Sequence, residues 1–233
     1  MGIAIAILIM GLWGGHLAYA LTSVEPVWTS PWMYLHMFLQ AYLYTGLFIT
    51  GHDAMHRTVS RAAWVNKLVG YLSVFMFAGM SYGRLMKNHW EHHKYPGTAK
   101  DPDYYVKSQN FFAWWAAFMF RYTTIWQILA MAALYNVFKY LLHIPDTSLL
   151  VFWIIPALMG TFQLFYFGTF VPHRKPHTRD MGKHRARTLK KNHLWAMISC
   201  YFFGYHLEHH QAPGTPWWKL YQIKNNSIQL DHD

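Results

Sequence analysis

Three short clusters of histidine are the residues of this sequence with the most definite chemistry. The first cluster is HDAMH, and the second and third both follow the pattern HxEHH. On a helix, residues three and four apart project from one face, so each cluster aims its imidazoles in one direction. The eight side chains are His52, His56, His89, His92, His93, His206, His209 and His210.

Neutral imidazole is the commonest metal ligand of proteins, so the clusters predict metal binding. One ion uses about four to six ligands, and eight histidines therefore predict two ions. The second and third clusters continue alike, as HWEHHKYPGT (His89–Thr98) and HLEHHQAPGT (His206–Thr215). Pro and Gly end a helix, so each cluster is expected to occupy a helical turn that stops soon after its last histidine.

The acidic residues are too few for a carboxylate-rich site. Carboxylate-bridged di-iron sites use Glu-x-x-His pairs, whereas this chain has only ten Asp and Glu in all. Glu91 and Glu208 lie off the histidine faces and either accept a histidine N–H or pair with nearby basic residues. Asp53 directly follows His52, so we expect it to accept the second ring N–H of a metal-bound histidine. A polyhistidine site next to a membrane suits iron and O₂ chemistry on a lipid-soluble substrate.

The sequence offers no electron carrier of its own. Cys200 is the only cysteine, which excludes an intramolecular disulfide and a four-cysteine iron–sulfur cluster. No P-loop is present, and no GxGxxG motif follows a strand. Electrons for O₂ chemistry would therefore come from an external donor.

Four long apolar segments must position the histidines. Three carry no Asp, Glu, Lys or Arg, and the fourth, Tyr122–Leu142, carries only Lys139. Such lengths are typical of helices that cross the hydrocarbon core, and buried helices of a soluble protein are the alternative. We predict an all-α integral membrane protein with one domain, residues 1–233, and spans at about 2–22, 32–51, 121–142 and 149–171. Shorter apolar segments at 64–82, 111–120 and 194–205 are predicted to be interfacial or re-entrant.

The basic residues predict the orientation in the membrane. Of 20 Lys and Arg, eight lie in Gly51–Asn110 and ten follow Pro172, whereas the connections Ser23–Ser30 and His143–Ser148 have none. Basic residues stay on the cytoplasmic side, so the metal site and both termini are predicted to be cytoplasmic. The net charge of +10 is thereby explained by the lipid bilayer, and no nucleic-acid partner is predicted.

The histidines outside the clusters divide by position. His16, His36 and His143 lie in or beside spans and are predicted to be structural. The basic tail holds three that are predicted to be solvated, His177, His184 and His193. His173 closes the fourth span on the side of the clusters, so position alone leaves it either structural or a ninth ligand.

Longer motifs around these histidines resemble a known superfamily. The three clusters are similar to those of the membrane fatty-acid desaturase and hydroxylase superfamily. More narrowly, the chain resembles the bacterial β-carotene ketolases over nearly its whole length. The stretches that carry this resemblance are LYTGLFITGHDAMH, HHKYPGTAKDPDYY, FYFGTFVPHR, HRAR and GYHLEHHQAPGTPWWKL.

The resemblance implies a specific enzyme. It implies four membrane helices with a cytoplasmic di-iron cap, and His173 as a further ligand. It gives His184 and Asp101 or Asp103 a functional role without defining it. The implied reaction adds keto groups at C4 of the β-ionone rings of β-carotene, using O₂ and a ferredoxin-like donor, by two successive hydroxylations and a dehydration.

Two alternatives stay open from the sequence. A carotenoid ring hydroxylase or a fatty-acid desaturase would use the same metal site on another substrate or stop oxidation earlier. A histidine-rich membrane metal transporter or sensor would bind the metal without catalysis. Transport favours ligands near the middle of the bilayer, whereas the clusters lie at the predicted cytoplasmic ends of the spans.

Overall fold

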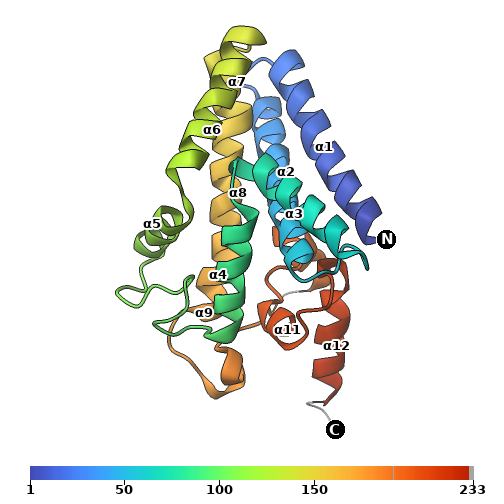
Figure 1. The fold of residues 1–233 in the computed structure, drawn as a ribbon, viewed down its shortest axis with the longest axis vertical. Helices are drawn as coiled ribbons and strands as arrows, with labels where there is room; N and C mark the ends of the chain where they lie inside the picture. The colour runs from blue at the N-terminus through green and yellow to red at the C-terminus, as the bar shows by residue number, and fades with distance from the viewer. Residues whose placement is uncertain (191, 231–233) are drawn as a thin grey trace.

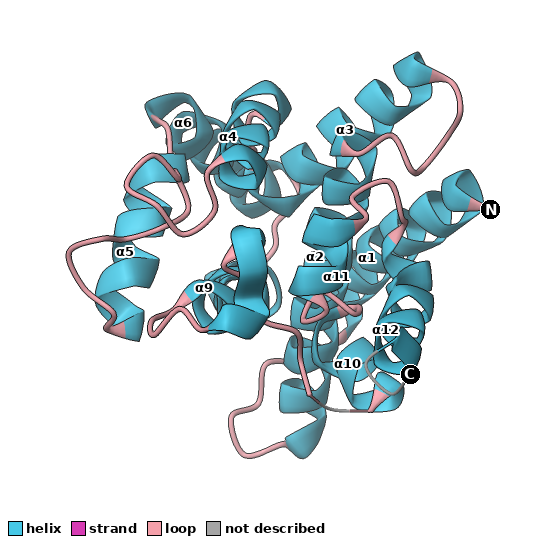
Figure 2. Cartoon of the chain, turned by 90° about the horizontal axis from the view of Figure 1, so that it is seen from below, coloured by secondary structure: helices cyan, strands magenta, loops and turns pink. Residues whose placement is uncertain are grey.

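Helices are the only regular secondary structure in the described part of the chain, and loops connect them (Figure 2), as the sequence predicts. A computed structural model describes residues 1–190 and 192–230, and no strand occurs among them. The helices are α1 (Gly2–Ser23), α2 (Pro31–Met55), α3 (Ala63–Ala78), α4 (Tyr82–Lys94), α5 (Phe111–Tyr122), α6 (Ile125–Asn136), η1 (Val137–Leu141), α7 (Asp146–Leu149), η2 (Leu150–Ile154), α8 (Ile155–Phe165), η3 (Tyr166–Phe170), α9 (Val171–His173), η4 (Arg179–His184), α10 (His193–Cys200), α11 (His206–Gln211), η5 (Trp217–Lys219) and α12 (Leu220–Leu230).

The long helices run lengthwise through the molecule (Figure 1). Among the described residues, two helices are long and apolar enough to cross a membrane, Gly2–Ser23 and the continuous helix Asp146–His173. Two bent pairs would each add a span if counted as one, α3 with α4 at 101° and α5 with α6 at 87°. The described residues therefore give two to four candidate spans. The two long helices among them agree with the predicted segments 2–22 and 149–171.

The predicted span 32–51 lies within α2, whose hydropathy is lower than that of the two long candidates. Its polar side chains are buried and have partners on neighbouring helices. The Gln40 side-chain oxygen lies 2.6 Å from His16 Nδ1 on α1, and the Thr45 hydroxyl donates to the side-chain oxygen of Gln163 on α8. A central helix can carry such groups because its neighbours satisfy them, whereas a lipid-facing helix cannot.

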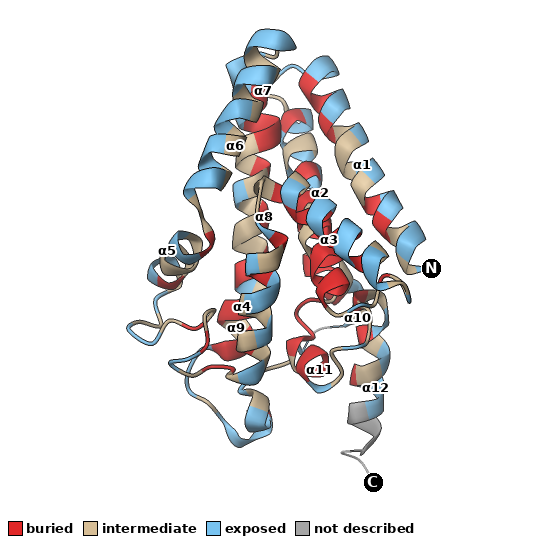
Figure 3. Ribbon diagram, viewed as in Figure 1, coloured by how far each residue is buried: buried red, intermediate tan, exposed pale blue. Residues whose placement is uncertain are grey.

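Outer faces of the bundle are apolar and exposed (Figure 3). On α6 no residue is buried, and Ile125 and Trp126 are 62% and 77% exposed. Exposed apolar surface on this scale is unfavourable in water and favourable against lipid tails. The part of the helical bundle with these exposed apolar faces is therefore suited to a membrane.

The predicted span 121–142 differs from the structure at its start. α5 ends at Tyr122, and α6 with its extension η1 covers Ile125–Leu141. Thr124 begins α6 as its N-cap, since its hydroxyl accepts the N–H of Gln127 at 3.1 Å. Thr123 and Thr124 have extended backbones and separate the two helices, so the helix starts later than hydropathy alone indicated.

The four segments that carry the histidines end at the same part of the molecule (Figure 1). The first cluster lies at the end of α2, and the second lies on α4. His173 is the last residue of α9, and the third cluster lies on α11. The start of α1 reaches the same region, because a Cβ on Gly2 would lie 2.3 Å from the Val59 carbonyl oxygen. The fold thus gathers at one end residues that lie more than 150 positions apart.

Candidate metal centre

Eight of the nine predicted ligands converge in two adjacent groups. Each group places one ligand atom per residue within 4.8 Å of every other, as a metal ion would require. His93 lies between the groups. Its Nε2 atom is 3.1 Å from that of His89 and 2.9 Å from that of His209, and its ring centroid is 4.4 Å from that of His210. The first group is His52, His56, His89 and His209, and the second is His92, His173, His206 and His210.

The spacing of the ring nitrogens fits coordination. Two nitrogens bound to one ion at about 2.1 Å lie roughly 3.0 Å apart at a right angle and roughly 3.4 Å apart at the tetrahedral angle. In the first group the Nε2 atoms of His56 and His89 are 2.7 Å apart. In the second group the Nε2 atom of His210 lies 3.1 Å from those of His92 and His206, which are 3.5 Å from each other. Each group could therefore hold a metal ion.

Four buried ring nitrogens in the groups have no hydrogen-bond partner among the described residues. They are Nε2 of His52 and of His173, and Nδ1 of His206 and of His210. His173 donates its Nδ1–H to the backbone carbonyl of Arg185 at 2.9 Å, which leaves the Nε2 lone pair free. A histidine whose second nitrogen donates to a carbonyl is the usual arrangement of a metal ligand. The structure thus brings His173 into the second group.

The histidines of the third cluster are neutral. Burial lowers the pKa of His206, His209 and His210 well below the ordinary value. Neutral imidazole is the form that binds a metal ion. The site is thus prepared for cations rather than for anionic ligands.

Asp101 orients His92. His92 donates its Nδ1–H to the Asp101 carboxylate, with both oxygens at 3.0 Å. The backbone N–H groups of Gly97 and Asp103 also donate to this carboxylate, each at 2.8 Å. Burial alone would raise the pKa of Asp101, but His92 and these donors hold it below its usual value. The sequence singled out Asp101 or Asp103 without a role, and the loop geometry supplies one for Asp101.

Asp53 makes a different contact from the one expected. Its Oδ1 atom lies 3.9 Å from Nδ1 of His52, which is longer than a hydrogen bond. Its Oδ2 atom accepts the backbone N–H of Trp217 at 3.2 Å. Asp53 therefore joins the end of α2 to the segment after α11.

The remaining histidines lie outside the two groups. His16 and His36 contact each other, with His16 Nε2 3.0 Å from His36 Nδ1, as expected of structural residues. His193 is not simply solvated, since its Nδ1 lies 2.8 Å from the Tyr205 hydroxyl. His184 has its ring centroid 5.6 Å from that of His210, at the edge of the second group.

The two Pro-Gly turns that follow the HxEHH clusters differ in backbone conformation. Gly97 has a φ of +63°, which favours glycine, and its N–H reaches Asp101. A Cβ there would lie 3.2 Å from Cβ of Arg185. Gly214 has no positive φ, and a Cβ there would meet nothing within 4 Å. The repeated sequence therefore performs two different structural tasks.

Gly97→Ala is expected to destabilise the protein by about 1–2 kcal/mol, the cost of a side chain in the left-handed region. Thermal unfolding of the detergent-purified protein measures this as a midpoint a few degrees lower. Gly214→Ala is the matched control and should leave the midpoint unchanged. Equal midpoints for the two variants would contradict the assignment.

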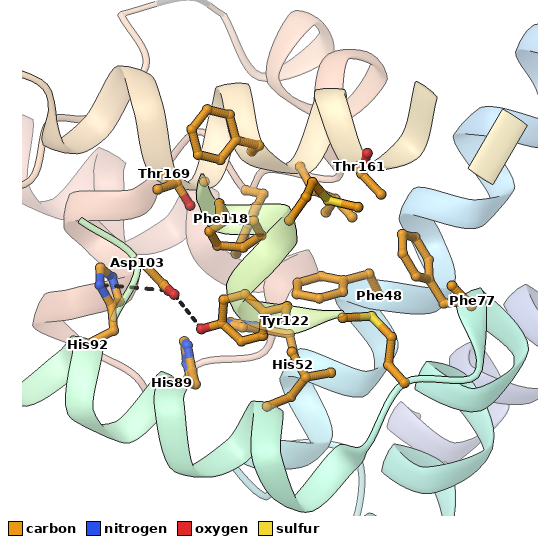
Figure 4. Close-up of a pocket in the computed structure, with 18 of the residues that line it drawn as sticks. Phe48, His52, Phe77, His89, His92, Asp103, Phe118, Tyr122, Thr161 and Thr169 are labelled. Atoms are coloured by element: carbon orange, nitrogen blue, oxygen red, sulfur yellow. Dashed lines mark hydrogen bonds and ion pairs between the residues drawn. The ribbon is translucent and has the colours of Figure 1, made fainter. Parts of the chain in front are cut away.

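An apolar cavity adjoins both histidine groups. About 880 Å³ of space within it is not filled by protein atoms, counting its open side. His52 and His89 of the first group and His92 and His206 of the second reach its wall. Figure 4 shows aromatic side chains around the rest of the cavity, with the histidines at one end. Aromatic and aliphatic lining residues are Phe48, Met55, Phe77, Ala78, Met80, Leu85, Phe118, Met119, Leu164, Phe165 and Phe203.

One glycine lets the cavity wall close against the third cluster. Gly168 lies in η3, and a Cβ on it would be 2.0 Å from the ring of Phe203. Phe203 in turn contacts His52 and His206 with ring centroids 5.1 and 5.5 Å apart. The FGTF sequence before His173 thus permits the close approach of two segments that hold ligands.

Two polar residues interrupt the apolar lining close to His92. The Tyr122 hydroxyl donates to Oδ1 of Asp103, and Oδ2 of Asp103 lies 3.9 Å from Nδ1 of His92. Burial raises the pKa of Asp103 above its ordinary value. The cavity therefore has a polar end beside the metal centre and an apolar remainder, which suits a long apolar molecule that is modified at its tip.

Comparison with known proteins agrees with this site. Residues 26–135 and 110–230 match the family model described as fatty acid desaturase. The chain therefore belongs to the fatty acid desaturase family.

Its relatives within that family include carotenoid ketolases, which confirms the resemblance seen in the sequence. The chain is 37% identical over 94% of its length to the zeaxanthin 4-ketolase of Chlamydomonas reinhardtii. It is 40% identical over 77% of its length to a β-carotene ketolase of Haematococcus lacustris, and 35% identical over 77% to a β-carotene ketolase of Paracoccus sp. (strain N81106 / MBIC 01143). It spans 52% and 58% of the first two relatives and 74% of the third.

Proposed function

We propose that the chain is a membrane oxygenase that introduces keto groups at C4 and C4′ of the β-ionone rings of β-carotene, giving echinenone and canthaxanthin. The observation that carries the proposal is the apolar cavity into which both histidine groups open. The relatives of this chain that are named as ketolases of β-carotene or zeaxanthin support the choice of a carotenoid as substrate. Two successive hydroxylations at one carbon followed by loss of water would give each ketone.

The proposed cofactors are two iron ions held by the nine histidines, with O₂ as co-substrate. Iron bound there would supply the activation of O₂. Electrons would come from an external ferredoxin-like protein, because the chain has a single cysteine and thus no cluster of its own. The protein's own residues would bind the ring, exclude water and hold C4 towards the ligands.

The proposed arrangement in the membrane is one domain of residues 1–233 with four spans, in a cell membrane or another carotenoid-bearing membrane. Its metal centre and both termini would face the cytoplasm. The concentration of Lys and Arg in Gly51–Asn110 and after Pro172 supports this orientation. A substrate dissolved in the bilayer would reach the cavity from the apolar half of the molecule, and no nucleic acid is needed as a partner.

Expression in a bacterial host that accumulates β-carotene tests the proposal. We expect echinenone and canthaxanthin to form, identified by absorption spectrum and mass, and to be absent from the same host without the gene. Hydroxylated carotenoids alone would indicate a ring hydroxylase instead. Unchanged β-carotene with altered membrane fatty acids would indicate a desaturase.

A metal transporter or sensor is the competing function from another class. The histidines meet at the ends of the helices rather than midway along them, which is unfavourable for transport across the bilayer. The same host decides the matter, because ketone formation by a variant that lacks cluster histidines would disprove a metal-dependent oxygenase.

A further inference from the structure

Asp103 is a carboxylate in the wall of the apolar cavity, and it lies outside the two four-histidine groups. Its side chain is 14% exposed, and it lies near His92 at the polar end of the cavity (Figure 4). Burying such a group is costly unless it receives hydrogen bonds, so its presence calls for a partner. The question is what that partner is.

Three hydrogen bonds fix the position of Asp103, one within its loop and two from α5. Its backbone N–H donates to Oδ1 of Asp101, and its backbone carbonyl accepts the indole N–H of Trp114 at 2.7 Å. The Tyr122 hydroxyl donates to its Oδ1. No described residue donates a hydrogen bond to Oδ2, because the Nδ1–H of His92 is already given to Asp101. Asp103 thus presents one oriented and available acceptor beside the ligands.

The proposed conversion of a β-ionone ring into its 4-ketone needs such an acceptor only after the first hydroxylation. The first step replaces one C4–H by C4–OH, with O₂, two electrons and two protons consumed and one water released. The second step does the same to the remaining C4–H, and the resulting diol loses water to leave C4=O. Between the steps the ring carries a hydroxyl in an apolar cavity, and the remaining C4–H must face the metal centre.

We propose that Asp103, held in place by Tyr122, accepts a hydrogen bond from the hydroxyl of the half-oxidised ring and turns its remaining C4–H towards the metal centre. The inference rests on the proposed function and deepens it. Asp103 is a positioning residue that favours the ketone over the alcohol as the final product. It is neither consumed nor oxidised in either step.

Other polar side chains of the cavity are less suited to this task. Thr161 lies at the end away from the histidines (Figure 4), and its hydroxyl donates to the Leu158 carbonyl at 2.7 Å. A charged acceptor also binds a hydroxyl more strongly than a neutral one does. Its carboxylate charge therefore distinguishes Asp103 from the neutral threonine and glutamine residues of the lining, which are Thr123, Gln127, Thr161 and Thr169.

Asp103→Asn is the sharpest variant because it changes one atom. The Tyr122 hydroxyl needs an oxygen to donate to, so the amide NH₂ would occupy the position of Oδ2 and offer a donor where an acceptor is needed. With β-carotene as substrate, we expect the ratio of 4-hydroxylated to 4-keto products to rise by about tenfold, as for loss of one hydrogen bond to a charged group. With a 4-hydroxylated ring as substrate, kcat/KM should fall by about the same factor, and the first hydroxylation of β-carotene should fall by a smaller factor.

Tyr122→Phe provides a second, milder variant that keeps the carboxylate. It should raise the same ratio by a smaller factor, because Asp103 loses only the group that fixes its orientation. Matched controls at an exposed site are Tyr135→Phe, which removes a Tyr–Asp hydrogen bond of 2.6 Å, and Asp146→Asn, which neutralises the carboxylate of that pair. Both controls should keep the wild-type ratio.

The outcomes separate the inference from the proposed function. A wild-type protein that forms no ketone overturns the proposed function itself. Ketone formation by the wild type, with both cavity variants slowing the two hydroxylations equally, overturns the role of Asp103. An increased alcohol fraction in the cavity variants alone supports it.

Discussion

His209→Ala is expected to remove one metal ion and to lower ketone formation by more than about 100-fold, the upper range for loss of residues that merely support ligands. His209 contributes to the first group and approaches His93 as well, so its loss leaves three of the four histidines of that group. O₂ chemistry that uses both ions would then stop. Metal content per purified chain and pigment conversion in the host measure the two effects.

His206→Ala tests the independence of the second group. It should also cost one ion, but from His92, His173 and His210 rather than from the first group. A variant with both changes should bind neither ion, since each group has lost a ligand. His143→Asn is the control, because His143 is exposed and its φ of +56° is one that Asn tolerates. Two ions retained in both single variants would disprove the assignment of the groups.

The three clusters could be predicted from sequence because their geometry is local. Helical spacing alone sets the direction of His89, His92 and His93, and the chain needed only to bring three such faces together. The all-helical class followed equally from long apolar runs. These features depend on a few neighbouring residues, and the structure agrees with them.

Contacts that depend on the path of a loop could not be predicted in this way. Asp101 reaches His92 only because Gly97 turns the chain with a positive φ, and nothing in the spacing of the motif reveals this. Asp53 was the expected acceptor because it is adjacent to His52 in sequence, yet adjacent residues on a helix point in different directions. Its carboxylate accordingly meets Trp217 instead.

The helix limits show the same division. The predicted segments 111–120 and 121–142 separate α5 from α6 but place the boundary too early, because the Thr124 hydroxyl that caps the start of α6 leaves no mark in hydropathy. Hydropathy also predicted a span within α2 just as it did for the outer helices, although the polar groups of α2 find hydrogen-bond partners inside the bundle. Both differences come from hydrogen bonds, to which an average over residues is insensitive.

Asp101→Asn is expected to weaken metal binding in the second group by about 10–100-fold, the usual cost of changing a residue that orients a ligand. The reason is that both carboxylate oxygens accept a backbone N–H as well as the His92 proton. Either orientation of the amide places its NH₂ against one of these donors, from Gly97 or from Asp103. A buried donor would then lack its acceptor, and His92 would lose its fixed orientation.

Asp53→Asn is the matched comparison, since it makes the same chemical change beside the first group. Only one oxygen of Asp53 accepts a hydrogen bond from the backbone, so the amide can keep its oxygen towards Trp217. We expect a much smaller loss of metal affinity, measured by competition with a chelator for each purified variant. Equal losses in the two variants would mean that the 3.9 Å separation of His52 and Asp53 closes when metal binds, and that Asp53 orients His52 as Asp101 orients His92.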